Sequence, residues 1–497
     1  MKRHLNDHIS GRYVGALPAD FLHTHRYSQC LACSFLIHYR YNGVCPSCQE
    51  PMRAIAAARS MAQPVAPAVA SGGNHSRRRQ APSLDDIFDN YVPTWKHIPK
   101  QLQPLWSKAL AQAVAAAVAS NGVQAWSDLL MLPKCVLCSP PRSGKAHHNK
   151  RLAFTRSRLQ RWVAGERGSL WDDIPSYTPP RNKRISEEAV KHRRHAACID
   201  LCGEGALGKS CSSLVQEAPL GRTRAVADQL REKHPVAAAP PDLSHLAAPG
   251  SGAVPRFECE AVLRAIRSFS PHSGAGPSAL RPLHLQKALH GAHRDEVVGH
   301  ITALAQLLAK GEAPRVLAPY LAGGALTALP KDDGSIRPVA VGETWRRLTA
   351  KLLCADFQEQ ASAYLWPLQI GVSQSRGTEV GLHVARQWCR RNAGSPNAVF
   401  LKIDFENAFN TVSRQAFLEQ CRHRFPGLSP YAEWCYDNPS QLFFGSHRLA
   451  SQCGVQQGDP LGPLLFSLAL QPVLQKLRAR RCEGGLQLFI PTWTTAA

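Results

Sequence analysis

Two stretches poor in bulky apolar side chains divide this chain of 497 residues. Residues 54–85 and 236–254 are rich in Ala, Pro, Gly and Ser. Such segments bury too little apolar surface to offset the entropy that is lost on ordering, so we expect linkers there. Folded regions are then expected at 1–53, 86–235 and 255–497. Hydrophobic residues make up 44% of the chain, which is enough for folded cores and excludes wholesale disorder.

The net charge narrows the class of partner. Lys and Arg number 59 against 36 Asp and Glu, which gives a formal charge of +23. A chain this basic favours a polyanionic partner, with nucleic acid ahead of a membrane surface. No apolar run reaches the roughly 18 residues that cross a bilayer. No apolar segment follows the basic start at Met1–His4, as a secretion signal requires. We therefore expect an intracellular protein without a membrane partner.

Two CxxC pairs lie near the N-terminus. Cys30 and Cys33 form the first pair, Cys45 and Cys48 the second, and eleven residues separate the pairs. Thiolates two residues apart can converge on one tetrahedral ion, and in a reducing compartment such pairs are zinc ligands before they are disulfides. We predict a small structural zinc module over residues 1–53, closed to substrate because four thiolates complete the coordination. The alternative is four unbound thiols in a Cys-rich chain.

The region 86–235 has apolar residues at helical spacing, and from Arg142 to Arg194 fourteen Lys and Arg stand against five Asp and Glu. A weaker zinc candidate lies here, built from Cys135 and Cys138 with His147 and His148. Three other cysteines are expected on buried helix faces, where free cysteines commonly lie: Cys198, Cys202 and Cys211.

The C-terminal region contains a hairpin signal. Two extended runs within residues 326–341 flank Asp333-Gly334, a dipeptide typical of hairpin turns. Lys331 precedes the turn and Arg337 follows it, so the hairpin would present two cations side by side. Such a pair suits a polyphosphate. The alternative is an ordinary charged hairpin, and this segment taken alone favours the alternative.

A buried strand is expected at 398–403, with Asp404 at its end. A carboxylate that leaves an apolar strand is costly unless it binds a cation or is hydrogen-bonded. The alternative is that Asp404 binds no cation and only caps the end of the strand. Ser413 is well placed to cap the helix that follows.

A stiff Gly/Pro-rich turn is expected after residue 456, before an amphipathic helix that begins near Leu464. Backbone amides at such a helix entrance suit a phosphate or a base edge. Gln457, just ahead of the turn, is a candidate hydrogen-bond partner for a nucleotide.

These three segments resemble successive motifs of reverse transcriptases from non-LTR retrotransposons, in the same order and at similar spacing. They read LPKDDGSIRPVAVGETWRRLTAK, LKIDFENAFNTVSR and GVQQGDPLGPLLFSLAL, and the run QGDPLGPLLF is highly specific. Residues 204–235, 269–289 and 368–388 are also similar to that family, so the resemblance covers about residues 186–490.

The resemblance implies an α+β fold, a right-hand polymerase with fingers and partial palm, preceded by the helical N-terminal region and the zinc module. It implies RNA-directed DNA synthesis by two-metal nucleotidyl transfer, with Mg2+ or Mn2+ as cofactor. The implied partners are template RNA, primer or target DNA, and dNTP. The implied location is the nucleus, with a cytoplasmic ribonucleoprotein stage.

Site residues follow from motif position in the same resemblance. Asp404 would bind Mg2+ with the carbonyl of Phe405, and Phe409 would exclude the ribose 2′-hydroxyl. The residues that would contact the incoming nucleotide are Lys331, Arg337, Phe405, Phe409, Gln457 and Gly458.

The chain departs from the family pattern after residues 485–490. A Tyr-x-Asp-Asp turn is due there and would supply two more metal-binding carboxylates, yet no acidic residue lies beyond Glu483. If the codons are read from the last base of the Pro491 codon, Trp493 and Thr494 force one Asp, and the neighbouring codons permit Tyr-Leu-Asp-Asp-Gly. We therefore expect a frameshifted or wrongly predicted gene product, cut off within the palm and without a thumb.

Two classes of function stay open. The first is a reverse transcriptase that does not polymerise as this chain, because one carboxylate cannot hold two divalent ions against their mutual repulsion. The second is a non-catalytic nucleic-acid-binding remnant, in which the zinc module and the basic helices bind RNA. Asp332, Asp333 and Asp459 are expected in turns and are poor substitutes for the missing carboxylates.

Overall fold

The structure is a computed structural model and describes residues 27–29, 36–38, 81–140, 147–175, 187–203, 207–215, 219–248, 254–331, 333–401 and 403–479. The chain separates into two compact units, Met1–Arg77 and Arg78–Ala497. Helices predominate in the described part of the second unit, where four strands form one small mixed sheet. The prediction of a mixed helix-and-strand fold is therefore confirmed.

In the first unit the structure describes one antiparallel strand pair, β1 (Tyr27–Gln29) and β2 (Leu36–His38). The predicted zinc ligands lie outside the described residues, so the zinc module stays a prediction: Cys30, Cys33, Cys45 and Cys48.

The described residues of 81–140 and 147–175 are mostly helical, as their apolar spacing predicts. Ser83 begins the first helix with a capping box that involves Asp86. Asn121 ends the long second helix in the left-handed conformation. The elements are α3 (Leu84–Asp89), η1 (Lys100–Leu102), α4 (Gln103–Ser120), α5 (Val123–Leu137), α6 (His147–Val163) and α7 (Arg167–Asp172).

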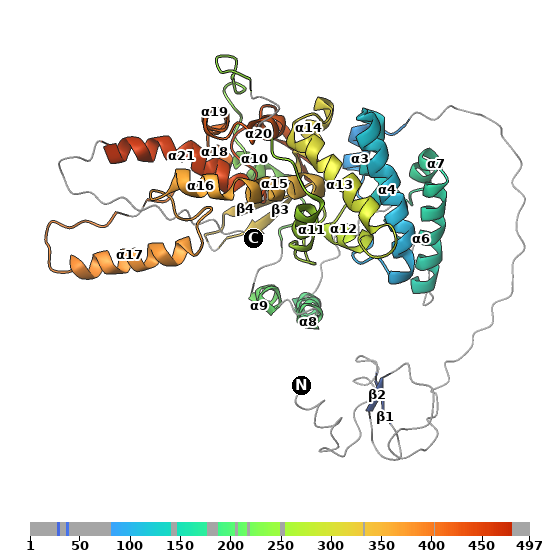
Figure 1. The fold of residues 1–497 in the computed structure, drawn as a ribbon. Helices are drawn as coiled ribbons and strands as arrows, with labels where there is room; N and C mark the ends of the chain where they lie inside the picture. The colour runs from blue at the N-terminus through green and yellow to red at the C-terminus, as the bar shows by residue number, and fades with distance from the viewer. Residues whose placement is uncertain are drawn as a thin grey trace, which may run out of the picture. The chain divides into compact units, whose positions relative to one another are not determined.

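These N-terminal helices share one hydrophobic core with the C-terminal part of the unit. Trp106 of α4 is fully buried, and its indole N–H donates to the carbonyl of His284 at 2.9 Å. Helix α13 (Arg294–Ala309) packs on α4 and also on α15 (Thr344–Asp356), so it joins the two halves (Figure 1). The remaining helices of this core are α11 (Cys259–Arg267), α12 (Pro282–Ala288), α14 (Ala318–Leu321), α16 (Gln358–Leu365), α19 (Arg414–Arg424), α20 (Ser429–Tyr436) and α21 (Gly462–Ala479), with η3 (Arg315–Leu317) before α14.

Helices α8 (Glu187–Gly203) and α9 (Leu207–Val215) pack on each other. The prediction that their cysteines are buried is wrong, because Cys198 is half-buried and Cys202 and Cys211 are exposed. The Cys198 and Cys202 sulfurs lie 3.0 and 2.9 Å from the Ser210 hydroxyl, so a polar contact takes the place of an apolar core here.

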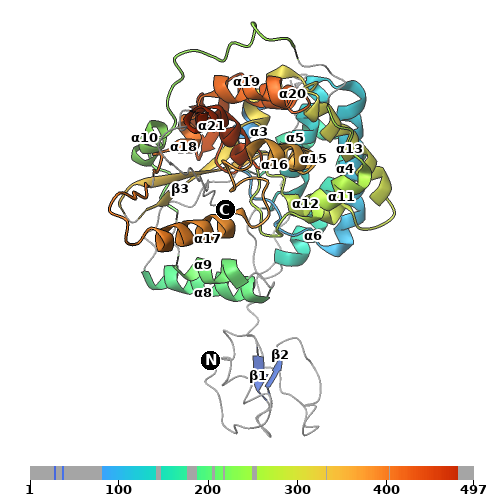
Figure 2. The same cartoon turned by 60° about the vertical axis from the view of Figure 1, so that its left-hand side comes forward.

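The mixed sheet has the order β4-β3-β5-β6, with β3 parallel to β5 and the other neighbours antiparallel. Its strands are β3 (Gly324–Pro330), β4 (Ile336–Gly342), β5 (Ser440–Phe444) and β6 (His447–Ser451). One face is buried against α10 (Arg224–Glu232), a helix that Thr223 caps (Figure 2). Apolar side chains fill this contact: Ala227, Leu230, Leu326, Ala328, Ile336, Ala340, Leu442, Phe444 and Leu449.

The described part of the predicted 236–254 linker lies along α19. Arg422 donates to the carbonyls of Leu243 and Leu246 at 2.7 and 3.0 Å. The backbone N–H of Asp242 donates to Gln415 at 2.7 Å. This segment is therefore held at several points by side chains of one helix.

The prediction of a strand at 398–403 is wrong. The described residues of this segment, 398–401 and 403, form no strand and pair with none of the described strands. A strand needs a ladder and packed neighbours, and apolar composition alone supplies neither. Its apolar side chains are instead exposed to water: Val399 (79%), Phe400 (58%), Leu401 (74%) and Ile403 (68%).

Two helices flank this apolar run. The ring of Phe400 lies 5.7 Å from that of Trp388 in α17 (Gly377–Arg391). Helix α18 (Ala408–Thr411) follows the run. Ser413 then caps α19 as predicted, since its hydroxyl accepts from Ala416 N at 3.2 Å. No helix among the described residues is long and apolar enough to span a membrane.

Candidate functional site

The β3–β4 hairpin is formed as predicted. The N–H of Lys331 donates to Ser335 O at 2.9 Å, and Gly334 N donates back to Lys331 O at 3.0 Å. Gly334 has a φ of +77°, which favours glycine. Arg337 lies opposite Leu329 and shares its face of the hairpin, and Lys331 follows two residues later. Both cations are exposed, on the side away from α10.

The Gly/Pro-rich turn at 454–461 contacts the other two motifs through the backbone. Ala340 N of β4 donates to Gln457 O at 3.2 Å. Val455 N donates to Phe409 O at 2.7 Å, and Gly454 N donates to the carbonyl of residue 412 at 3.0 Å. Three segments that are far apart in sequence therefore meet at this turn.

Two glycines allow this close approach. Gly454 and Gly458 have φ values of +69° and +104°. A Cβ at Gly454 would lie 2.2 Å from Phe409 O, and one at Gly458 would lie 2.4 Å from Ala340 O. A side chain at either position would push the turn away from its neighbour, so both positions need glycine.

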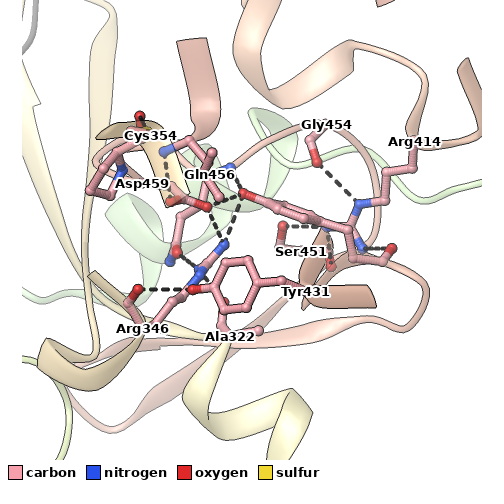
Figure 3. A network of polar contacts seen from close by, with 12 residues as sticks. Ala322, Arg346, Cys354, Arg414, Tyr431, Ser451, Gly454, Gln456 and Asp459 are labelled. Atoms are coloured by element: carbon pink, nitrogen blue, oxygen red, sulfur yellow. Dashed lines mark hydrogen bonds and ion pairs between the residues drawn. The ribbon is translucent and has the colours of Figure 1, made fainter. Parts of the chain in front are cut away.

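A buried ion pair anchors the turn. Asp459 lies 2.7 Å from the guanidinium of Arg346, and their side chains are 0% and 2% exposed. The carboxylate also accepts from the Tyr436 hydroxyl at 2.6 Å, and Arg346 donates to Ala322 O and to Gln456 (Figure 3). Desolvation acts to lower the pKa of Arg346, but the Asp459 carboxylate and the nearby Tyr and Cys side chains together outweigh it and raise that pKa above its usual value. Arg346 is therefore protonated, and it is hydrogen-bonded to Asp459.

A second buried arginine holds the strand that leads into the turn. Arg414 donates to Gly454 O at 3.1 Å, to Ser451 O at 3.0 Å and to Tyr436 O at 3.2 Å (Figure 3). The guanidinium carbons of Arg346 and Arg414 lie 5.2 and 5.3 Å from the Tyr436 ring centre. Burial lowers the pKa of Arg414 to about 10, so it is protonated at neutral pH.

Sequence reasoning missed this network. It placed Asp459 only in a turn and gave no role to Arg346, Arg414 or Tyr436. One signal was available, because Arg346 follows Trp345 at the start of a helix whose inward face is otherwise largely apolar. A cation on such a face needs a buried partner.

Asp404 and Phe405 are exposed, and no strand positions them. The next residues bind the C-terminal end of α10. Glu406 pairs with the Lys233 ammonium at 3.4 Å, and Asn407 donates to the Lys233 carbonyl at 2.8 Å. The carboxylate of Asp404 is therefore near an anchored segment, but no side chain among the described residues holds it.

Phe409 is half-buried. Its ring stacks on Phe466 of α21 with centroids 5.3 Å apart, and its carbonyl is bound by the turn at Val455. Gln457 is half-buried and Gly458 is exposed on the same turn. The structure thus joins Phe409, Gln457 and Gly458 to β4 of the hairpin that bears Lys331 and Arg337, and it leaves Asp404 apart.

In the part of the chain that the structure describes, no group of three or more His, Cys, Asp or Glu side chains could hold a metal ion. Asp404 alone does not fit a two-ion centre. Cys135 and Cys138, from the weaker zinc candidate, are buried at the end of α5. Burial raises the pKa of both thiols and opposes the thiolate form that zinc requires.

Residues 329–490 match the family model for reverse transcriptase (RNA-dependent DNA polymerase). Over 179 residues the chain is 26% identical to the Retrotransposable element SLACS 132 kDa protein of Trypanosoma brucei gambiense, a match that covers 35% of this chain and 15% of that protein. Over 174 residues it is 26% identical to the Retrovirus-related Pol polyprotein from type-1 retrotransposable element R2 of Popillia japonica, covering 32% of this chain and 24% of that protein. The matches thus span less than a quarter of either relative. Residues 329–490 of this chain therefore form a reverse transcriptase domain, and the chain is distantly homologous to proteins of non-LTR retrotransposons.

Proposed function

We propose that this chain binds a dNTP and a template–primer for RNA-directed DNA synthesis, with residues 255–497 as the fingers and part of the palm of a right-hand polymerase. Nucleic acid, dNTP and a divalent metal are what a reverse transcriptase domain implies. The main support for this proposal is the turn at 454–461, which is hydrogen-bonded both to β4 of the cationic hairpin and to Phe409.

Each site residue has a proposed role. Lys331 and Arg337, on the exposed side of the hairpin, bind the triphosphate, since ammonium and guanidinium groups match phosphate oxygens. Gln457 hydrogen-bonds the incoming nucleotide, and the N–H of Gly458 faces its phosphates or base. Phe409 excludes the ribose 2′-hydroxyl, a role that needs a fixed ring. Stacking on Phe466 and the bond to the Phe409 carbonyl supply that constraint.

Asp404, with the carbonyl of Phe405, is the proposed ligand for one divalent ion. A second and third carboxylate would be needed for two ions, and no acidic residue lies beyond Glu483 in this sequence. We therefore expect substrate binding without primer extension by these 497 residues. The second candidate function is a non-catalytic nucleic-acid-binding protein, and it is favoured by the exposed position of Asp404, for which the described residues offer no neighbouring group of metal ligands.

Nucleotide binding tests the proposal. We expect Lys331→Gln and Arg337→Gln each to weaken dATP binding by about tenfold, the loss of one charge-assisted hydrogen bond. Arg391→Gln removes the same charge from the exposed end of α17 and serves as the matched control. Calorimetry that gives equal dATP affinities for all three variants would refute the triphosphate role.

Primer extension separates the two candidate functions. We expect the 497-residue chain to bind a primed RNA template without extending the primer. Template-dependent synthesis that Asp404→Ala abolishes would contradict the non-catalytic reading. Absence of dATP binding, together with RNA binding that survives Lys331→Gln, would favour it.

The zinc module is proposed on the spacing of its two CxxC pairs. The strands β1 and β2 flank the first pair in sequence, and a strand pair is a common support for two thiolates. We expect one zinc per chain by elemental analysis, lost in the Cys45→Ser/Cys48→Ser double variant. Cys259→Ser/Cys389→Ser, which changes two exposed cysteines, is the matched control. Equal zinc content in both double variants would rule out the module.

A further inference from the structure

A polar cavity lies between α16, α19 and α21. Helices α16 and α19 each pack on α21 (Figure 1). Its volume is about 470 Å³, within the usual range for small-molecule sites. The lining residues come from all three helices: Tyr364, Gln420, His423, Arg424, Pro472 and Gln475. None of the reverse transcriptase site residues described above is among them.

The lining is rich in hydrogen-bond donors and contains no carboxylate. The Tyr364 hydroxyl donates to Gln420 Oε1 at 3.0 Å, which turns the Gln420 amide nitrogen toward other partners. The guanidinium carbon of Arg424 lies 5.7 Å from the Tyr364 ring centre. Stacking leaves the edges of a guanidinium available to an anion. Arg424 has no ion pair with a carboxylate in the described part of the chain.

Neighbouring acidic groups are already engaged elsewhere. Glu433 forms a bidentate pair with Arg422 at 2.8 and 2.9 Å. Glu419 accepts from Gln415 at 2.6 Å. At the end of α19 the Arg424 carbonyl accepts from Gln360 at 2.6 Å. Arg422 therefore neutralises the charge of Glu433, and one carbonyl of the helix C-terminus is already hydrogen-bonded.

We propose that this cavity binds a phosphate group and that the phosphate belongs to an RNA strand. A phosphate accepts hydrogen bonds and donates none when doubly ionised or esterified, which matches a lining of donors. Pro472 and the Tyr364 ring provide apolar surface for the attached sugar. A formal charge of +23 favours a polyanionic strand over a free anion as the source. The site is separate from the nucleotide site, and only the choice of RNA rests on the proposed function.

Binding of a 12-nucleotide single-stranded RNA by the full chain tests this site. We expect Arg424→Gln to weaken RNA binding by about tenfold and to lower the salt-dependence slope by about 0.7, the value for one phosphate contact on a single strand. Arg424→Lys keeps the charge but loses the planar fork, so it should restore only part of the affinity. Arg294→Gln removes one exposed charge from the start of α13 and is the matched control.

Inorganic phosphate and dATP are the other arms of the experiment. Loss of phosphate binding in Arg424→Gln with RNA affinity unchanged would keep the phosphate site but overturn the RNA assignment. Loss of dATP binding only in Lys331→Gln, with a normal Arg424→Gln effect on RNA, supports two separate sites. Equal RNA affinity and equal salt slopes in Arg424→Gln and Arg294→Gln would overturn the proposal. Matching thermal midpoints of the variants verify that all are folded.

Discussion

The hairpin β3–β4 and the run 398–405 look alike in sequence and differ in the structure. Both combine short apolar runs with charged residues that suit a nucleotide site. The hairpin has a buried face, a paired backbone and a neighbouring turn that is held by buried arginines. The run 398–405 is exposed and forms no strand.

The two segments differ in whether a partner strand is available to them. Residues 326 and 340 of the hairpin lie opposite each other and are brought together by a turn only five residues long. The apolar run must find a partner far away in sequence, and the described chain contains none for it. Apolar residues therefore define a strand only where a ladder is available to complete it.

The largest contrast is expected between two carboxylates. Asp459→Asn leaves the buried guanidinium of Arg346 without its counter-charge, and breaking such a pair costs about 3–5 kcal/mol of unfolding free energy. Glu406→Gln, beside the exposed run, removes the ion pair with Lys233, and the Glu406 side chain is 89% exposed. That change should cost less than about 1 kcal/mol. Urea unfolding followed by tryptophan fluorescence measures both, and equal losses would mean that the turn is not anchored by Asp459.

Two leucines give the next contrast. Leu326 of β3 is 2% exposed and Leu401 of the apolar run is 74% exposed. Leu326→Ala should cost about 2–4 kcal/mol, because a buried methyl cluster is lost and a cavity remains. Leu401→Ala should change the unfolding free energy by less than about 0.5 kcal/mol. The comparison fails if Leu401→Ala destabilises as much as Leu326→Ala, since the run would then be packed in solution.

Local features were predictable from sequence, and partners distant in the chain were not. The hairpin follows from Asp333-Gly334 between two adjacent runs, and the α19 cap follows from Ser413 alone. Arg346 and Asp459 are 113 residues apart, and no periodicity or turn signal links them. Nor does sequence say whether a strand-like run such as 398–403 has a neighbour to pair with.

The motifs located the site better than the local physics did. Taken residue by residue, the hairpin can be an ordinary charged hairpin, and Asp404 can be a carboxylate that caps a strand. The order and spacing of three motifs point to one site, and the turn at 454–461 does hydrogen-bond to the other two segments. The motifs did not point to the network around Tyr436, because its residues hold the turn and do not face a ligand.

Two glycines test how closely the turn must approach its neighbours. Gly458 has a φ of +104°, and a Cβ there would lie 2.4 Å from Ala340 O. Gly458→Ala should therefore cost about 1–3 kcal/mol and weaken dATP binding. Gly394, in the loop before the exposed run, has nothing within 4 Å of an added Cβ. Gly394→Ala should change stability by less than about 1 kcal/mol. Equal unfolding midpoints would show that the turn tolerates a side chain.

The smallest effect on stability is expected from making the apolar run polar. Its exposed side chains form an apolar surface of the kind that binds hydrophobic dyes and other chains. Leu401→Ser combined with Ile403→Ser should lower the fluorescence of bound anilinonaphthalene sulfonate and reduce aggregation, with the unfolding free energy changed by less than about 0.5 kcal/mol. A drop in stability with unchanged dye binding would show that these side chains are already covered. The run would then be a folded strand like β3, and its difference from the hairpin would disappear.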